Sequence, residues 1–441
     1  MTDVTSQPAR GRRLRLFLVL VVLGALLLLV AYAGVDLWAG HRVNVAVARL
    51  EKQYGRLSED TLGVARPPAG DNRAHVVWAA AALIEGGNSG NFHTTYSRFV
   101  QSGASAPVPA DLRIFVEANR LALRVADEAR TRRHSDWEVD YPLGSVGHLP
   151  LLNIRTLGNA TYLDGLLDLE AGRPADAAKA IATGLAVSGS LRQEPALIVQ
   201  LIRISVGMDL CDAVHRLVIQ SEPSKASLED LARWLVENRT PDPARVGLIS
   251  EMKHVNAAFT RLENGTFQPE MAELLPFVGG RAWRIESEPP FWLGPLARLE
   301  RPLIRLARAR YLQHVGDLLA VQAGPRPRPP FPQSARRVGS GWMRDMSGGL
   351  ERTIDTVDRF NSTLGATELA VALRRFRLDH GTYPDALSRL VPAYVAGVPI
   401  DPFTGQPPVY ARQGAGFHLR AEGGQHVPTV MMSALDWTVP K

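Results

Sequence analysis

One stretch of the sequence, Leu16–Val35, contains twenty consecutive residues without a charge. A helix rises about 1.5 Å per residue, so this stretch makes about 30 Å of helix, which matches the hydrocarbon core of a bilayer. The rest of the chain is polar enough to dissolve in water. The sequence therefore predicts a single transmembrane helix at residues 16–35, with the rest of the chain after it on one side of a membrane.

The charges on either side of this stretch predict its orientation. Four arginines precede it: Arg10, Arg12, Arg13 and Arg15. Because positive residues are retained in the cytoplasm, residues 1–15 are expected to form a cytoplasmic tail, and the chain from Asp36 onward to be exported. Tyr32 and Trp38 suit the far interface of the membrane. We predict a single-pass protein of a bacterial inner membrane with most of its chain in the periplasm.

Two other interpretations of the apolar stretch stay open. It fits a cleaved signal peptide, because Ala31-Tyr32-Ala33 is a small-x-small sequence that allows cleavage after Ala33. The uncharged stretch is longer than the usual apolar region of a signal peptide, which is about 7–15 residues. A buried core helix is the third interpretation. We prefer the retained anchor, and a cleaved signal would export the chain as well.

Composition favours helix and weighs against two classes of site. Ala, Leu and Arg dominate, and aromatic residues make up only 7% of the 441 residues. The single cysteine, Cys211, excludes an intramolecular disulfide and a cysteine-based metal site, and its apolar surroundings predict burial. The net charge of +6 is carried by residues 281–337, which hold eleven arginines and four acids. The remainder is near neutral, so no nucleic-acid partner is expected.

The central part of the chain is predicted to be an irregular array of helices. Helices are expected over 36–55, 72–85, 111–132, 151–170, 175–187, 194–219, 227–238 and 245–262. Residues 86–109 are expected to form a loop, and Ser227 with Asp230 indicates a capping box at the start of its helix.

The clearest local pattern is a helical hairpin over residues 151–189. Gly172 can end the first helix and Pro174 can begin the second. With Leu157-Gly158, Tyr162 and small alanines after the turn, this hairpin resembles one tetratricopeptide-type repeat. No 34-residue repeat recurs, so an ordinary antiparallel helix pair stays an equal alternative.

Five segments follow from these patterns. We expect a cytoplasmic tail at 1–15, a transmembrane anchor at 16–35, a helical domain at 36–323, a Pro/Gly-rich linker at 324–349 and a C-terminal module at 350–441. The linker is indicated by the sequence GPRPRPPFP at 324–332. The predicted fold class is mainly α, with a small C-terminal α+β module.

The sequence contains few patterns that indicate catalysis. No Walker loop, GxGxxG, HExxH or GxSxG motif occurs. Asp136, Glu138 and Asp140 alternate with other residues, which fits a solvated loop better than an acid/base pair. Gly339-Ser340-Gly341 fits a linker better than a nucleophile. We predict no catalytic residue, no cofactor and no metal ligand, and whether the protein is an enzyme stays open.

A basic face is predicted near residue 300. Arg298, Arg301, Arg305 and Arg308 fall on one side of a helix, while Leu299, Leu303 and Leu306 fall on another. Trp283, Phe291 and Trp292 precede them. A basic amphipathic helix beside aromatic residues is typical of a membrane-surface or acidic-partner contact. In the alternative interpretation, the arginine stems pack on neighbouring helices and their charged ends are solvated.

The segment Glu368–Tyr410 resembles the soluble part of type II secretion major pseudopilins. The residues that carry the resemblance are Phe376, Arg377, Asp379, Gly381, Tyr383, Pro384, Leu390, Val391, Pro392, Tyr394, Asp401, Pro402, Phe403, Gly405, Pro407 and Tyr410. The residues themselves predict a helix with Leu369, Leu373 and Phe376 on its apolar side that ends near Gly381, a tight turn at Asp401, and paired strands over 408–411 and 416–420. The resemblance makes seven residues candidates for an interaction module: Phe376, Tyr383, Pro384, Asp401, Pro402, Phe403 and Tyr410.

The chain also departs from that family. Its apolar helix lacks the glycine processing site and the glutamate that the family has, and more than 300 residues separate it from the module. The family's calcium-binding aspartate is absent from residues 421–425, so calcium is not expected. The arrangement as a whole resembles uncharacterised membrane-anchored bacterial proteins.

These patterns predict a cell-envelope scaffold or protein-interaction protein. It would be held in the inner membrane by its N-terminal helix, would bind an unidentified protein partner, and would act near secretion or pilus-type machinery. The alternative is a cell-envelope enzyme with an unrecognised active site.

Overall fold

The computed structural model describes residues 8–59, 62, 70–87, 89–102, 106–139, 149–239, 243–264, 299–331, 341–421 and 436–439. Within these residues the chain is mainly helical, with one long apolar helix near the N-terminus and a small antiparallel sheet near the C-terminus. The predicted fold class is therefore confirmed.

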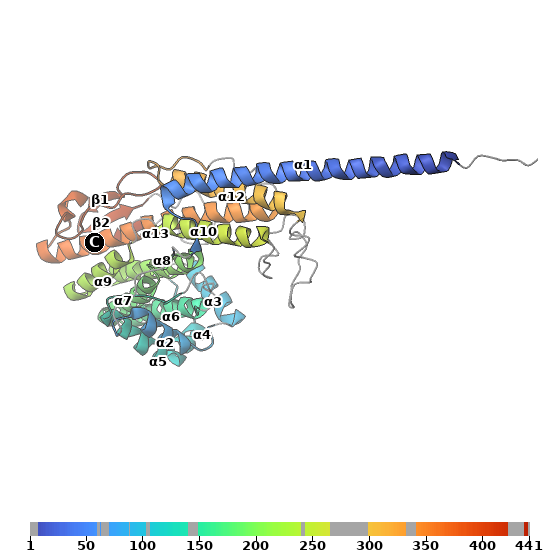
Figure 1. The fold of residues 1–441 in the computed structure, drawn as a ribbon. Coiled ribbons are helices and arrows are strands. Elements are labelled where there is room, and N and C mark those ends of the chain that lie inside the picture. The colour runs from blue at the N-terminus through green and yellow to red at the C-terminus, as the bar shows by residue number, and fades with distance from the viewer. Residues whose placement is uncertain are drawn as a thin grey trace, which may run out of the picture. The chain divides into compact units, whose positions relative to one another are not determined.

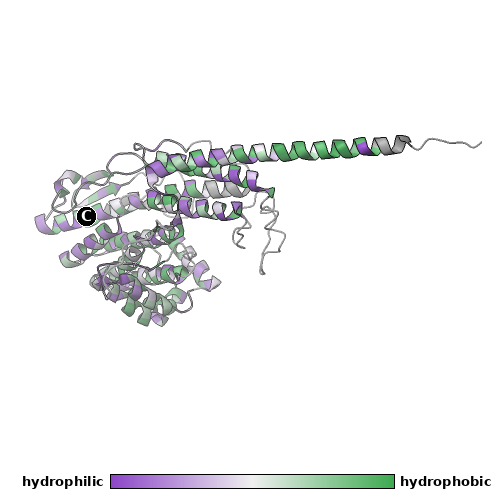
Figure 2. Cartoon of the chain, in the orientation of Figure 1, coloured by the Kyte–Doolittle hydropathy of each residue, from purple (hydrophilic) through white to green (hydrophobic). Residues whose placement is uncertain are grey.

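Helix α1 (Pro8–Tyr54) is a single continuous helix that includes the whole apolar stretch. The large apolar side chains between Leu14 and Val30 are all more than half exposed, and the hydropathy view shows this part of α1 as mostly apolar (Figure 2). A soluble protein rarely exposes so large an apolar area. By its length and composition α1 is able to cross a membrane.

The chain packs into two units, and each unit combines segments that are distant in sequence. The first unit consists of Met1–Ser58, Met252–Asp317 and Pro332–Gly348. The second unit consists of Glu59–Glu251, Leu318–Phe331 and Gly349–Lys441. In this grouping, helices from the middle of the chain pack beside α1, and the C-terminal helix packs beside central helices.

The first unit contains α1, the end of α10 (Pro243–Glu263) and most of α12 (Arg301–Gln322), which Figure 1 shows side by side. Leu50, Phe259 and Leu312 belong to its buried core. The rings of Phe259 on α10 and Tyr311 on α12 lie 6.3 Å apart between centroids. This packing holds the C-terminal half of α1 against two other helices.

The second unit begins with short helices: α2 (Arg73–Ala82), α3 (Gly90–Gln101), α4 (Ala110–Ala118), α5 (Arg120–Asp127) and the 3-10 turn η2 (Glu128–Thr131). The loop predicted for residues 86–109 is wrong in its middle, where α3 forms. Ser89 caps α3 by accepting a hydrogen bond from the Phe92 backbone N–H. Phe92, Tyr96 and Phe99 then form a buried stripe, and burial of these aromatic rings offsets the weak helix propensity of the segment.

The helix predicted over 111–132 is interrupted at Asn119. The Asn119 side chain accepts a hydrogen bond from the Glu85 backbone N–H at 2.8 Å and donates to the Glu85 carbonyl at 3.1 Å. Asparagine readily exchanges helical hydrogen bonds for such side-chain contacts. The break redirects α5 toward α2, α6 and α7, with which it packs.

The predicted hairpin is present as α6 (Leu151–Glu170) and α7 (Pro174–Ser190). Gly172 adopts a φ of +72° in the turn, a backbone conformation that favours glycine, and Pro174 begins α7. Both helices also pack against α8 (Leu197–Gln220), and α7 packs against α9 (Lys225–Asn238). The N-cap of α9 is Ser224, so the capping box predicted at Ser227 is wrong by one turn.

The C-terminal part consists of α13 (Gly341–His380), the 3-10 turn η6 (Leu387–Leu390) and strands β1 (Val409–Gln413), β2 (Gly416–Arg420) and β3 (Asp436–Val439). The strands form an antiparallel sheet in the order β1-β2-β3, with Tyr410 opposite Leu419. The helix end at Gly381, whose φ is +75°, and the β1–β2 pairing are as predicted. Helix α13 begins inside the predicted linker, and residues 332–340 of that linker lie outside the described residues.

Candidate functional site

Two arginines of the predicted basic face are enclosed in the first unit. The Arg305 guanidinium lies 2.9 Å from the Asp36 carboxylate and 3.1 Å from the Glu263 carboxylate. Arg308 lies 2.8 Å from Glu263 and donates to the Asn256 side chain at 3.0 Å. The side chains of Arg305 and Arg308 are only 16% and 11% exposed. They connect α12 to α1 and α10, and they present little charge to an external partner.

The other two arginines of that face have different positions. Arg301 has a 43% exposed side chain whose Nε lies 3.8 Å from an Asp36 carboxylate oxygen. Arg298 lies outside the described residues, and so do Trp283, Phe291 and Trp292. Of the described arginines of the face, Arg301 has the most exposed side chain. The membrane-surface or acidic-partner role of this face stays a prediction.

The aromatic residues of the predicted interaction module mostly form its interior. Tyr383 is buried against Phe417, with ring centroids 4.9 Å apart. The Tyr410 hydroxyl donates to the Pro384 carbonyl at 2.6 Å, and burial raises the pKa of Tyr410 to about 12. Phe376 is buried beside His380. The Tyr383–Phe417 and Tyr410–Pro384 contacts attach the sheet to the segment that follows α13.

Asp401, Pro402 and Phe403 form the predicted tight turn. The buried Asp401 carboxylate accepts a hydrogen bond from the Phe403 backbone N–H at 2.9 Å, and the Gly405 N–H donates to the Asp401 carbonyl at 2.8 Å. Pro402 is buried and Phe403 is half-buried. This aspartate therefore organises the turn, and its carboxylate is directed to the backbone.

Helix α13 is attached to the helices before it by charged contacts. The Arg374 guanidinium contacts the Glu222 carboxylate at 2.9 Å and also the Val218 carbonyl at the end of α8. The Lys225 ammonium lies 2.5 Å from Asp379, and the Tyr394 hydroxyl donates to the same carboxylate at 2.8 Å. The hydrogen bond from Lys225 is the main reason why the pKa of Asp379 is lowered.

The predicted row of acidic residues separates in the structure. Asp136 is buried and accepts from the Glu138 backbone N–H at 2.8 Å. Glu138 is directed outward, to the exposed His75 at 3.1 Å. Asp140 lies outside the described residues. Asp136 and Glu138 therefore do not form an acid/base pair, in agreement with the preferred interpretation as loop residues.

A charged groove that sequence reasoning missed lies on α5, α6 and α7 of the second unit. Its volume is about 610 Å³. Four aspartates line it: Asp127, Asp164, Asp168 and Asp176. Four basic residues line it as well: Arg120, Arg124, Arg173 and Lys179. We call this set of residues the charged groove.

The charges of the groove are arranged in pairs. Arg120 contacts Asp164, Arg173 contacts Asp168, and the Lys179 ammonium lies 2.9 Å from Asp127. Burial raises the pKa of Asp164 despite its contact with Arg120. Burial also acts to raise the pKa of Asp127, but hydrogen bonds from Lys179, Arg130 and Thr183 lower it overall. The groove thus offers fixed charges of both signs on a rigid helical framework.

A second polar cluster lies inside the second unit. The Tyr96 hydroxyl donates to Asp209 at 2.7 Å, and the Tyr162 hydroxyl donates to Asp212 at 2.8 Å. Arg216 donates to Asp212 at 2.8 Å. Burial raises the pKa of Asp209 to about 7. The side chains of this cluster are all buried, so it lies in the interior between α3, α6 and α8.

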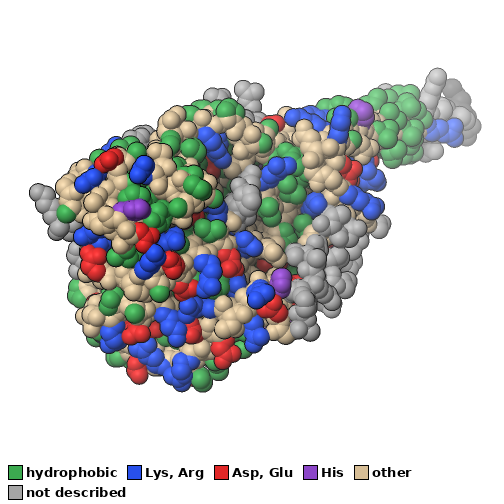
Figure 3. All heavy atoms as spheres, turned by 90° about the vertical axis from the view of Figure 1, so that its left-hand side faces the viewer, with side chains coloured by type: hydrophobic (Ala, Val, Ile, Leu, Met, Phe, Trp, Pro, Cys, Tyr) green, Lys and Arg blue, Asp and Glu red, His purple; other side chains and the backbone are tan. Residues whose placement is uncertain are grey.

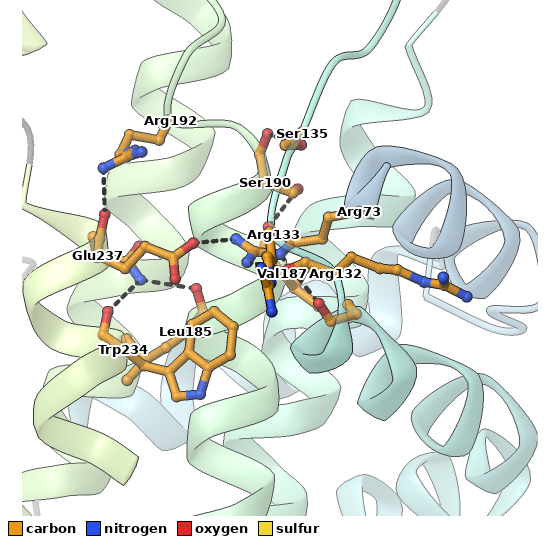
Figure 4. A network of polar contacts seen from close by, with 12 residues as sticks. Arg73, Arg132, Arg133, Ser135, Leu185, Val187, Ser190, Arg192, Trp234 and Glu237 are labelled. Atoms are coloured by element: carbon orange, nitrogen blue, oxygen red, sulfur yellow. Dashed lines mark hydrogen bonds and ion pairs between the residues drawn. The ribbon is translucent and has the colours of Figure 1, made fainter. Parts of the chain in front are cut away.

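A third network, shown in Figure 4, joins α2, the 3-10 turn η2 and α9 through buried Arg73. Its guanidinium contacts Glu237, donates to the Ala129 and Arg132 carbonyls at 3.1 and 2.7 Å, and lies 4.9 Å from the Trp234 ring centroid. Arginine provides donors in a fixed planar arrangement, which suits such a junction. This network therefore fixes α2 against η2 and α9.

The chain matches no known protein family, no curated protein and no solved structure. Its function has to be argued from its own geometry. Basic and acidic side chains are interspersed over the face seen in Figure 3.

The sequence contained a partial signal for the groove. Asp164 and Asp168 are one turn apart on the predicted first helix of the hairpin, and Asp176 and Lys179 are similarly spaced on the second. The signal was incomplete because Arg120 and Arg124 come from a helix more than 40 residues earlier. Their position depends on the break at Asn119.

Proposed function

We propose that the protein is a membrane-anchored scaffold that binds a partner protein in the charged groove. The observation that carries this proposal is the groove itself, because its charges of both signs are held at fixed positions by α5, α6 and α7. A partner segment that carries acidic and basic residues in alternation would exchange some of the internal ion pairs for pairs of its own. Such complementarity gives specificity more than affinity.

Helix α1 supplies the second part of the proposal. The arginines before the apolar stretch support an N-terminus in the cytoplasm and an exported body, in a bacterial inner membrane. Protease added outside spheroplasts should then degrade the second unit and leave a short N-terminal fragment. Full protection of the chain until the membrane is permeabilised would contradict this orientation.

A link to secretion or pilus-type machinery rests on the C-terminal resemblance alone, which is a weak argument for function. In-cell crosslinking of the full-length chain, followed by purification in mild detergent and mass spectrometry, tests it. Helix α13 has to be retained, because Arg374 and Phe360 contact α8. The deletion should therefore begin at Gly381. The supporting result is that the full-length chain captures secretion components and the chain that lacks residues 381–441 does not.

The groove is tested in the same experiment by Arg124→Glu. Arg124 is exposed, lines the groove and lies in the last turn of α5. Arg98 is a matched control, because it is exposed in the last turn of α3 and does not line the groove. We expect R124E to reduce capture of the partner at least fivefold while R98E leaves it unchanged. Equal capture by both variants would contradict binding in the groove.

A further inference from the structure

Helix α12 runs parallel to α1, and the offset between neighbouring residue numbers on the two helices stays nearly constant. Gly40 of α1 lies against Arg305 of α12, where a Cβ on the glycine would be 3.1 Å from the guanidinium. A second contact lies further along both helices, where Leu50 of α1 lies against Gly316 of α12. Leu50 is ten residues after Gly40, and Gly316 is eleven residues after Arg305. Two parallel helices rise equally per residue. Within α12, Leu303 is therefore level with Trp38, and the first residue, Arg301, is level with Asp36; Leu299 lies two residues before α12 begins.

This register places the start of α12 at the end of the apolar stretch. Asp36 is the first residue after that stretch. If α1 crosses a bilayer, the residues level with Asp36 to Trp38 lie at the boundary between hydrocarbon and headgroups. The ion pair of Arg305 with Asp36 holds α12 at this position along the axis of α1.

The side chains at this level are apolar and exposed. Leu37 and Trp38 of α1 are 73% and 53% exposed, Leu303 of α12 is 38% exposed, and Leu299, two residues before α12 begins, is 69% exposed. We call these four residues the interfacial patch. Exposed leucines and an exposed tryptophan are unfavourable in water, whereas they match the composition of a membrane interface.

Two basic side chains accompany the patch. Arg42 is exposed, and its guanidinium lies 5.3 Å from the Trp38 ring centroid. It follows Val35 by seven residues, which is about 10 Å of helix and reaches the headgroup layer. Arg301 lies between Leu299 and Leu303 in sequence, and its side chain is 43% exposed. Both arginines can meet phosphates of lipids whose chains contact the patch.

We propose that the interfacial patch is a second membrane contact, in which the start of α12 enters the interface of the bilayer that α1 crosses. Arg42 and Arg301 bind anionic lipid headgroups there. The proposal rests on α1 being a membrane anchor. With two helices at the interface, α1 cannot rotate freely about its axis, so the rest of the first unit is held in one orientation to the membrane.

Depth-dependent quenching in reconstituted full-length protein tests the contact. Bimane is attached to single cysteines introduced as L299C, L303C, R310C or L27C, in bilayers with and without doxyl-labelled lipids. Cys211 is buried and its pKa is raised to about 12 by burial, so the native thiol does not react. Arg310 is an exposed control on α12, level with Val45 and about 15 Å beyond the apolar stretch.

We expect strong quenching at 27, clear quenching at 299 and 303, and less than a tenth of the fluorescence lost at 310. Quenching at 27 without quenching at 299 and 303 would overturn the second contact and leave the anchor intact. No quenching at 27 would overturn the anchor, and with it this proposal.

The role of Arg42 and Arg301 is tested by removing their charges in bilayers of different lipid charge. In bilayers with anionic lipid, R42Q combined with R301Q should reduce quenching at 303 at least twofold, while R310Q leaves it unchanged. In purely zwitterionic bilayers the double variant should behave as the parent. A double variant that matches the parent in anionic bilayers would overturn headgroup binding by these arginines.

Discussion

Arg305 of α12 and Asp36 of α1 form an ion pair at 2.9 Å, and Asp36 is the first residue after the apolar stretch. The same guanidinium donates to the Asp36 backbone carbonyl at 3.1 Å and contacts Glu263 of α10. One side chain therefore connects three helices at the point where α1 leaves its apolar part.

Replacing this arginine should loosen α1 from the other helices of the first unit. Arg305→Gln leaves the largely covered Asp36 without its main cation and removes one of the two arginines that pair with Glu263, which we expect to cost about 2 kcal/mol. Hydrogen exchange of residues 36–54, followed by mass spectrometry in detergent, should become at least tenfold faster. The exposed control R310Q should exchange at the parental rate, and equal rates for R305Q and R310Q would contradict the assignment.

Stability should decrease as the pH rises, because of Asp209. Burial raises its pKa to about 7 in the folded protein, from an ordinary value of 3.8. A carboxylate with a raised pKa favours the folded state when it is protonated, so its contribution is complete below about pH 4 and lost as the pH rises through about 7. The difference is of the order of 2–4 kcal/mol. Burial raises the pKa of Glu368 to about 7 as well, and its contribution has the same sign.

Asp209→Asn is the corresponding test. The amide keeps an oxygen for the Tyr96 hydroxyl and carries no charge. Unfolding measured by circular dichroism between pH 4 and pH 8 should show a flatter pH dependence and higher stability at pH 8 than the parent. An unchanged slope would mean that Asp209 does not titrate in this range.

Close packing of α6 on α8 should be sensitive to a single methyl group. A Cβ added at Gly158 would lie 2.4 Å from a methyl carbon of Val206. We expect Gly158→Ala to destabilise the second unit by about 2 kcal/mol through overpacking. Val206→Ala in the same chain should restore part of that loss, and thermal unfolding of the two single variants and the double variant measures the coupling. Additive effects would contradict a direct contact.

Two substitutions separate a hydrogen bond from packing in the C-terminal part. Tyr410→Phe removes the donor to the Pro384 carbonyl and should cost about 1 kcal/mol. Phe417→Ala removes the ring that packs on Tyr383 and should cost about 3–4 kcal/mol. Cleavage of the segment that follows Gly381, measured by limited proteolysis, should therefore accelerate far more in F417A than in Y410F. Similar acceleration by the two substitutions would show that packing on Phe417 does not hold this part together.

The sequence by itself determined the elements whose signals are local. The apolar stretch, the α6–α7 hairpin with Gly172 and Pro174, the end of α13 at Gly381 and the β1–β2 pair were all predicted within a few residues. Each depends on hydrophobic spacing or on backbone preferences of residues that are neighbours in the chain. Helix α3 was missed because its stability comes from burial of three aromatic rings against other helices rather than from propensity.

Tertiary structure alone decided which residues meet. Arg305 and Arg308 were predicted as an accessible basic face, and only the fold brings them to Asp36 and Glu263, in helices distant along the chain. The charged groove likewise combines α5 with the hairpin that follows it. A charge pattern in a sequence shows which side of a helix is polar, but it contains no information on whether water, lipid or another helix covers that side. The packing of apolar faces settles that question, and it depends on contacts across the whole chain.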